Sequence, residues 1–166
     1  MKKMMLVLGF IFCFPMISYG AGYVLANYAD GGDIHESSYG IELGAIFLSD
    51  LHPNGGAVSI GVGVSLADTD ESPPSSRYST GEYNDGNEQE IDLVLGAEIV
   101  PAFFGVVGVG YSSQDVIKPS LISNDNEDTE TNTPWLAGVR YAVESFNMGV
   151  GYNSRRGIMV SLGLAF

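Results

Sequence analysis

The sequence predicts an all-β protein, an eight-stranded antiparallel up-and-down β-barrel that spans a membrane. Three features predict it: an alternating C-terminal segment, glycine-rich alternating segments between acidic stretches, and an apolar N-terminal leader. From Ile158 to Phe166, large apolar residues fill the even positions, and the odd positions are mostly small or weakly polar. Successive strand residues face opposite sides. A small rather than charged second face is typical of a strand between lipid and a narrow lumen.

The N-terminus has the pattern of a secretory signal peptide. Lys2 and Lys3 precede an apolar run that ends near Ile17, and small residues follow up to Gly20. This predicts a cleaved leader over residues 1–20 and a barrel domain over residues 21–166. The run is too short to favour a spanning helix. Cys13 is the only cysteine and lies in the leader, so we expect no disulfide and no thiol chemistry in the mature chain.

The composition is apolar but acidic. Hydrophobic residues make up 45% of the chain and charged residues 16%. Of the 7 basic residues two lie in the leader and five remain, against 20 acidic residues, which gives the mature chain a net charge near −15. Most of this charge lies in three polar segments, residues 30–38, 68–90 and 113–133, which we assign to outer loops. The acidic balance disfavours nucleic acid as a partner.

Eight alternating segments follow one another, most of them near the ~9–11 residues that a tilted spanning strand requires. Their expected ranges are 23–29, 39–48, 57–67, 90–100, 103–112, 135–144, 146–153 and 158–166. The connections after the second, fourth and sixth strands are short, and those after the first, third and fifth are long and polar. This alternation matches the short periplasmic turns and long outer loops of membrane barrels. Residues 154–157, after the seventh strand, form an outer connection that is short, in contrast to this alternation of lengths.

The alternation assigns one face of most strands to lipid. In chain order, the outward residues are Ile41, Leu43, Ala45 and Phe47; Val58, Ile60, Val62, Val64 and Leu66; Ile91, Leu93, Leu95, Ala97 and Ile99; Trp135, Ala137, Val139, Tyr141 and Val143; and Phe146, Met148, Val150 and Tyr152. None is charged, as expected where a charge in the hydrocarbon is costly. The phase of the first and fifth strands stays open.

Aromatic residues gather near both ends of the strands. The outer set is Tyr28, Tyr39, Tyr111, Trp135 and Tyr152, and the periplasmic set is Phe47, Phe103, Tyr141, Phe146 and Phe166. Amphipathic rings prefer the headgroup level, so two girdles are expected.

The opposite face predicts a charged lumen. Its charged members are Glu42, Glu90, Asp92, Glu98, Arg140 and Glu144. Arg140 is the only base among them, and in an eight-stranded ring its strand lies opposite the strand of Glu42. The pair could act as a gate that exchanges partners. The competing interpretation, a static polar plug, is favoured because an eight-stranded interior is just wide enough for side chains.

The ending Leu162-Gly163-Leu164-Ala165-Phe166 and this architecture resemble the small eight-stranded bacterial outer-membrane barrels of the OmpA transmembrane domain and OmpX type. Residues 137–141 and 149–152 are also similar to the end of YfaZ-type outer-membrane proteins. The resemblance implies a monomer in the bacterial outer membrane, surrounded by lipid and lipopolysaccharide. It also implies that Phe166 is a signal for the β-barrel assembly machinery.

Catalysis and metal binding have weaker support. Some eight-stranded barrels modify lipid A, but the His-Ser-Asn pattern of the lipid A deacylase barrels is absent. His35 has acidic and hydroxyl neighbours at the outer rim, and His52 precedes a proline in a periplasmic turn. The acidic loop clusters lack calcium-loop spacing. Arg155 and Arg156 either meet lipid phosphates or form an ordinary basic turn. We expect no cofactor and no metal.

The sequence therefore predicts an outer-membrane barrel with a structural or surface-interaction role and no catalysis. A small or gated, porin-like pore is the alternative, and a lipid A-modifying enzyme is the third hypothesis.

Overall fold

The computed structural model describes residues 20–34, 36–48, 56–69, 83–118 and 126–166. Residues 1–19 of the predicted leader, together with His35 and His52, lie outside these residues, and Gly20 is the first residue of the first strand. The described residues form nine strands and one short 3-10 helix, η1 (Gly32–Ile34). No helix in this part of the chain is long and apolar enough to cross a membrane.

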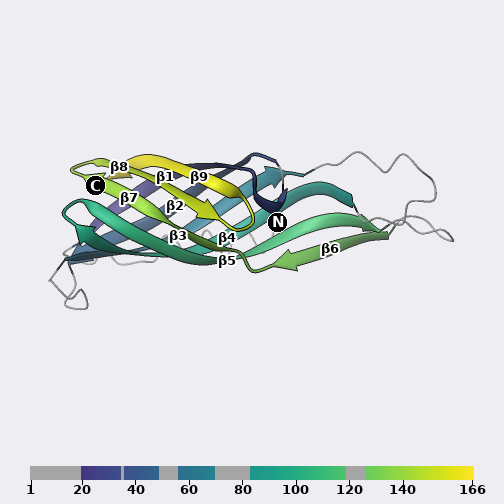
Figure 1. Ribbon diagram of the computed structural model, residues 1–166, viewed down its shortest axis with the longest axis horizontal. Helices are drawn as coiled ribbons and strands as arrows, with labels where there is room; N and C mark the ends of the chain where they lie inside the picture. Colours follow the sequence, from purple (N-terminus) through teal and green to yellow (C-terminus); the bar gives the residue numbers. More distant parts are fainter. Residues whose placement is uncertain (1–19, 35, 49–55, 70–82, 119–125) are drawn as a thin grey trace.

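Eight of the strands close into an antiparallel barrel (Figure 1). They are β1 (Gly20–Asp30), β2 (Ser38–Leu48), β3 (Ala57–Asp68), β4 (Tyr83–Val100), β5 (Phe103–Lys118), β7 (Trp135–Val143), β8 (Phe146–Asn153) and β9 (Gly157–Ala165). Each pairs with its neighbour along the chain, and β1 pairs with β9 from Tyr23↔Ala165 to Asp30↔Ile158. The predicted fold class is thus confirmed, and closure leaves no sheet edge along the barrel wall.

Two predicted loops contain strand. β4 begins at Tyr83 rather than near Glu90, and β5 continues to Lys118 rather than ending near Ser112. The additional strand β6 (Asn126–Asn132) pairs only with β5 (Ser112↔Asn132 to Lys118↔Asn126) among the described strands. These extensions project beyond the barrel at one end (Figure 1). Sequence alternation missed them because polar residues occupy both faces there.

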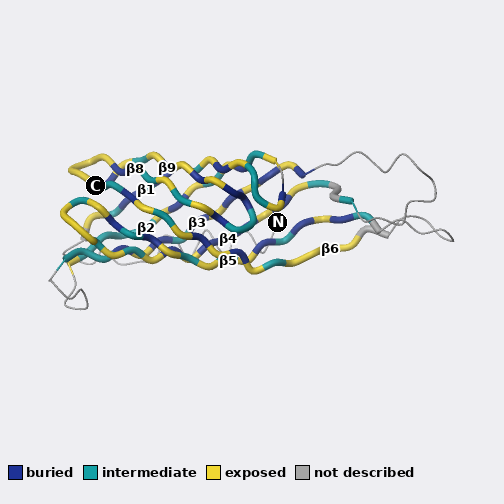
Figure 2. The backbone as a smooth tube through the Cα atoms, in the orientation of Figure 1, coloured by how far each residue is buried: buried dark blue, intermediate teal, exposed yellow. Residues whose placement is uncertain are grey.

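The wall alternates between buried and exposed residues, as Figure 2 shows along each strand. On β9 the even positions from Ile158 to Leu164 are 48–65% exposed, whereas Met159, Ser161 and Ala165 are buried. The outward residues predicted on β2, β3, β4, β7 and β8 all lie on the outer face. The structure also fixes the two open phases, since Tyr23 and Leu25 on β1 and Phe104 and Val106 on β5 face the lumen.

Aromatic residues pair across neighbouring strands near both ends of the barrel wall. Tyr28 and Tyr39 have ring centroids 5.4 Å apart, and Trp135 and Tyr152 have centroids 5.8 Å apart. Both pairs lie toward the end of the barrel that carries η1, and we use the word outer for this end. Phe103 and Tyr141 lie at 4.8 Å near the opposite end. The exposed ring of Phe166 also lies at that end, and its backbone exchanges two hydrogen bonds of 2.8 Å with Gly22 across the β1–β9 seam.

Candidate functional site in the barrel lumen

A buried ion pair crosses the lumen between β7 and β2. Arg140 donates from Nη1 to Glu42 Oε1 at 3.0 Å and from Nη2 to Glu42 Oε2 at 2.9 Å. The two side chains are 4% and 3% exposed. Tyr23 of β1 donates its hydroxyl to Glu42 Oε1 at 2.6 Å and accepts from Arg140 Nη1 at 3.2 Å. We call these three residues the inner network. Its bidentate geometry is the strongest form of a guanidinium–carboxylate contact.

Two glycines make room for the inner network. A Cβ atom at Gly61 would collide with the Tyr23 hydroxyl and lie 2.5 Å from Glu42 Oε1. A Cβ atom at Gly44 would collide with the Tyr23 ring. The glycines on the lumen faces of β2 and β3 are therefore required by the Tyr23 side chain from β1 and the Glu42 side chain from β2.

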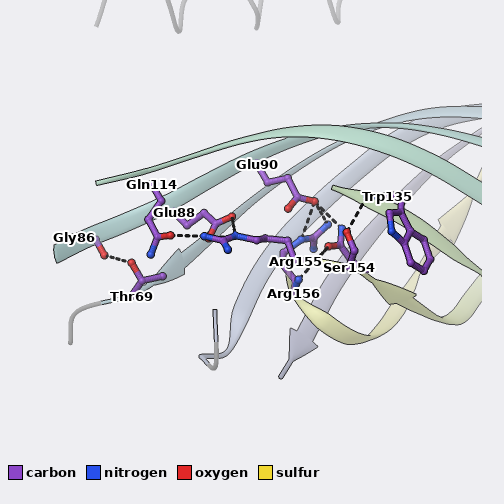
Figure 3. Close-up of polar contacts among 10 residues, drawn as sticks. Thr69, Gly86, Glu88, Glu90, Gln114, Trp135, Ser154, Arg155 and Arg156 are labelled. Atoms are coloured by element: carbon purple, nitrogen blue, oxygen red, sulfur yellow. Dashed lines mark hydrogen bonds and ion pairs between the residues drawn. The ribbon is translucent and has the colours of Figure 1, made fainter. Parts of the chain in front are cut away.

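A second set of ion pairs lies in the outer half of the lumen, and Figure 3 shows the contacts of Arg155 and Arg156 within it. Arg156 donates from Nε to Glu90 Oε1 at 3.0 Å and from Nη2 to Asp92 Oδ2 at 2.6 Å, and its side chain is 4% exposed. Asn153 Nδ2 also donates to Glu90 Oε1, at 2.7 Å. The neighbouring Arg155 binds Glu88 at 3.0 and 3.1 Å and donates to Gln114. These seven residues form the outer network, and every one of them except Arg155 is buried.

Backbone contacts hold the turn that carries both arginines. Asn153 Oδ1 accepts the backbone N–H groups of Arg155 (2.8 Å) and Arg156 (3.0 Å). The Arg155 carbonyl in turn accepts the N–H groups of Asp33 and Ile34 in η1, at 3.0 and 3.3 Å. Gly32 and Gly157 have φ of +73° and +81°, and a Cβ atom at either would press into the other's backbone. This close approach folds the β1–β2 connection over the β8–β9 turn at the outer mouth.

The lumen contains more arginine side chains than the sequence predicted. The expectation that Arg140 is the only lumen base is wrong, since Arg155 and Arg156 turn inward rather than toward lipid phosphates. Their signal was electrostatic: five predicted lumen acids with one base would leave buried charge uncompensated. The geometry of the β8–β9 turn places Arg155 and Arg156 where they supply the missing positive charge. Sequence alternation does not report this geometry.

The predicted acids occupy three different settings. Glu42 lies in the inner network, and Glu90 and Asp92 lie in the outer one. Glu98 is half-buried near the opposite end, where it accepts the N–H groups of Ala57 (3.0 Å) and Ala102 (2.9 Å). The predicted lumen position of Glu144 is wrong: β7 ends at Val143, and the exposed Glu144 has φ of +50° in the turn to β8.

An apolar cluster also occupies the lumen. Its buried members are Val94, Phe104, Val106 and Leu136. Among the described residues, no group of three or more His, Cys, Asp or Glu side chains is placed to hold a metal ion. The described lumen is thus built from apolar packing and paired charges.

Comparison with known proteins identifies the fold. No family model and no curated protein matches the chain, so the narrower similarity to YfaZ-type proteins stays a prediction. Among solved structures, the N-terminal β-barrel domain of Pseudomonas aeruginosa OprF aligns with a TM-score of 0.53 and 15% identity, over 88% of this chain and 97% of that one. Neisserial surface protein A (TM-score 0.39, 14% identity, 89% and 93% covered) and Ail of Yersinia pestis (0.43, 15%, 90% and 97%) also align. The chain has the closed eight-stranded barrel fold of the small outer-membrane proteins, as its sequence predicted.

Proposed function

We propose that this protein is a monomeric bacterial outer-membrane barrel with a structural or surface-interaction role and a closed lumen. The observation that carries the proposal is the lumen itself. Glu42, Asp92, Arg140 and Arg156 are each no more than 4% exposed, so paired side chains rather than an open passage occupy the centre. A buried, bidentate ion pair favours a rigid interior, because opening it would leave charges unpaired.

The outer wall supports the membrane assignment. Outward positions on every barrel strand carry exposed apolar side chains, among them Ile60, Leu95, Val107 and Leu162, which are 42–59% exposed. Such a surface would be unfavourable in water and is stable against lipid. The proposed surroundings are outer-membrane lipid and lipopolysaccharide, and Phe166, exposed at the end of β9, is the proposed contact of the β-barrel assembly machinery.

The projecting sheet supports a surface role. β4, β5 and β6 continue past the barrel wall (Figure 1), and the exposed residues there include Asp115, Asp128 and Glu130. The proposal places this acidic sheet outside the cell. A small or gated pore is the second candidate, favoured by the polar lining of the outer half of the lumen. The proposal includes no catalysis.

Four measurements test this proposal. The protein should fractionate with the outer membrane and migrate faster on a gel when unheated. A protease site placed between β5 and β6 should be cut in intact cells, whereas a site in the Glu144 turn should be cut only after lysis. Cutting at the Glu144 turn alone would reverse the orientation. Lipid A of unchanged mass in cells that overproduce the protein is expected, and a new lipid A species would replace this role with an enzymatic one.

A further inference from the structure

The buried charges of the described lumen do not balance. Glu42 pairs with Arg140, and Glu88 pairs with Arg155. Glu90 and Asp92, however, share Arg156. One carboxylate therefore lacks a guanidinium of its own at a position where both side chains are at least 95% buried. An uncompensated charge away from water is costly, so the pair requires one more positive charge or a neutralising proton.

The oxygen atoms that Arg156 leaves unused have no protein partner. Arg156 contacts Glu90 Oε1 and Asp92 Oδ2. Glu90 Oε2 and Asp92 Oδ1 are buried without a hydrogen bond. The guanidinium thus leaves one oxygen atom of each carboxylate without a hydrogen-bond donor.

Two serine hydroxyls flank this pair. Ser65 of β3 and Ser112 of β5 both pair in register with Glu90 on β4, so the three residues lie side by side on the lumen face. Ser65 is 5% exposed and Ser112 is fully buried, and neither Oγ atom has a hydrogen-bond partner. Asp92 is flanked in register by Gly63 and Gly110, which place no side chain beside it.

We propose that Glu90, Asp92, Ser65 and Ser112 bind one small monovalent cation, Na⁺ or K⁺, in the outer half of the lumen. Carboxylate and hydroxyl oxygens are hard ligands suited to such ions. A single positive charge balances the pair, whereas a divalent ion would reverse the imbalance. A shared proton between Glu90 and Asp92 is the competing way to remove the excess charge, and the experiment below distinguishes the two. The site extends the proposed role by giving the closed lumen a bound ion.

Cation-dependent stability tests the site. Refolded protein in lipid vesicles is unfolded with urea in NaCl or KCl, with N-methyl-D-glucamine chloride holding the ionic strength constant because that organic cation is too large for the lumen. Above the dissociation constant, a tenfold increase in Na⁺ or K⁺ should lower the unfolding equilibrium constant by up to about tenfold. Asp92→Asn should abolish this dependence, because it removes the excess charge and a ligand. Glu42→Gln, in the inner network, should lower stability but keep the dependence.

Four results would overturn the site. A wild-type unfolding free energy that does not change with Na⁺ or K⁺ concentration would show that water alone satisfies these oxygens. Uptake of one proton without any cation effect would assign the charge to a shared proton. A dependence that survives in Asp92→Asn would place the ion elsewhere, for example on the acidic outer sheet. If KCl supports the stability, crystals soaked with Rb⁺ should show an anomalous peak beside Asp92 Oδ1, and the absence of that peak in a K⁺-dependent protein would also reject the site.

Discussion

Removing the Arg140 guanidinium should destabilise the barrel through the charge that remains. In Arg140→Ala, Glu42 would keep the Tyr23 hydroxyl at 2.6 Å but lose both guanidinium contacts. Breaking a buried pair costs about 3–5 kcal/mol. A hydrogen bond to a charged group is itself worth about 1.5–3 kcal/mol, so the Tyr23 hydroxyl leaves Glu42 with one strong donor. The retained Tyr23 contact therefore places the expected decrease in unfolding free energy near the lower limit, at about 3 kcal/mol.

A double-mutant cycle measures the pair directly. Urea titration in lipid vesicles, followed by heat-modifiable gel mobility and by the fluorescence of the single tryptophan Trp135, gives each unfolding free energy. Arg140→Ala with Glu42→Gln should recover part of the loss, because the uncompensated charge is gone. Val139→Ala, on the lipid face beside Arg140, is the control for a change that leaves the pair intact. Strictly additive losses at Arg140 and Glu42 would refute the coupling. Coupling accompanied by a rise in conductance would favour the gate over the static plug.

Three further sets of variants test the seam, the lipid face and the lumen packing. Deleting Phe166 should reduce the amount of folded protein in the outer membrane. Phe166→Ala keeps the seam hydrogen bonds, so it should slow assembly in cells while leaving refolding in vesicles nearly unchanged. Normal assembly of both variants would reject the recognition role. Val62→Arg should cost about 2–4 kcal/mol if this outward site lies near the midplane, and unfolding titrations that show no loss would overturn the face assignment. Gly61→Ala should destabilise the barrel because its Cβ atom would collide with Tyr23. Gly63→Ala should be tolerated, because the nearest atom to its Cβ would lie 3.6 Å away. Equal urea midpoints for the two variants would contradict this packing.

Alternation predicted the wall because each strand has one lipid face and one lumen face. The even residues of β9 are outward as predicted, and a one-residue slip would have placed Met159 in lipid instead. The opposition of Glu42 and Arg140 also followed from strand order, since the second and sixth barrel strands face each other in a ring of eight. Pattern and topology thus account for the inner network.

Features set by turns and by long-range compensation could not be predicted in this way. Arg155 and Arg156 enter the lumen because Asn153, Gly32 and Gly157 shape the turn. No repeating pattern in the sequence reports these contacts. Glu144 fits the inward alternation of β7 but follows its last residue. The need for glycine at position 61 also lies outside the pattern, because only the structure shows that the Tyr23 hydroxyl occupies the space beside it.

The central claim is that paired side chains close the lumen, and conductance of the refolded wild-type protein tests it most directly. Protein whose folding has been verified by heat-modifiable mobility is inserted into planar bilayers and recorded across a range of voltages. We expect no stable conductance steps above the protein-free baseline, because Glu42–Arg140 and the outer network fill the interior. Reproducible steps of uniform size that disappear when the protein is unfolded would contradict the closed lumen and establish a pore.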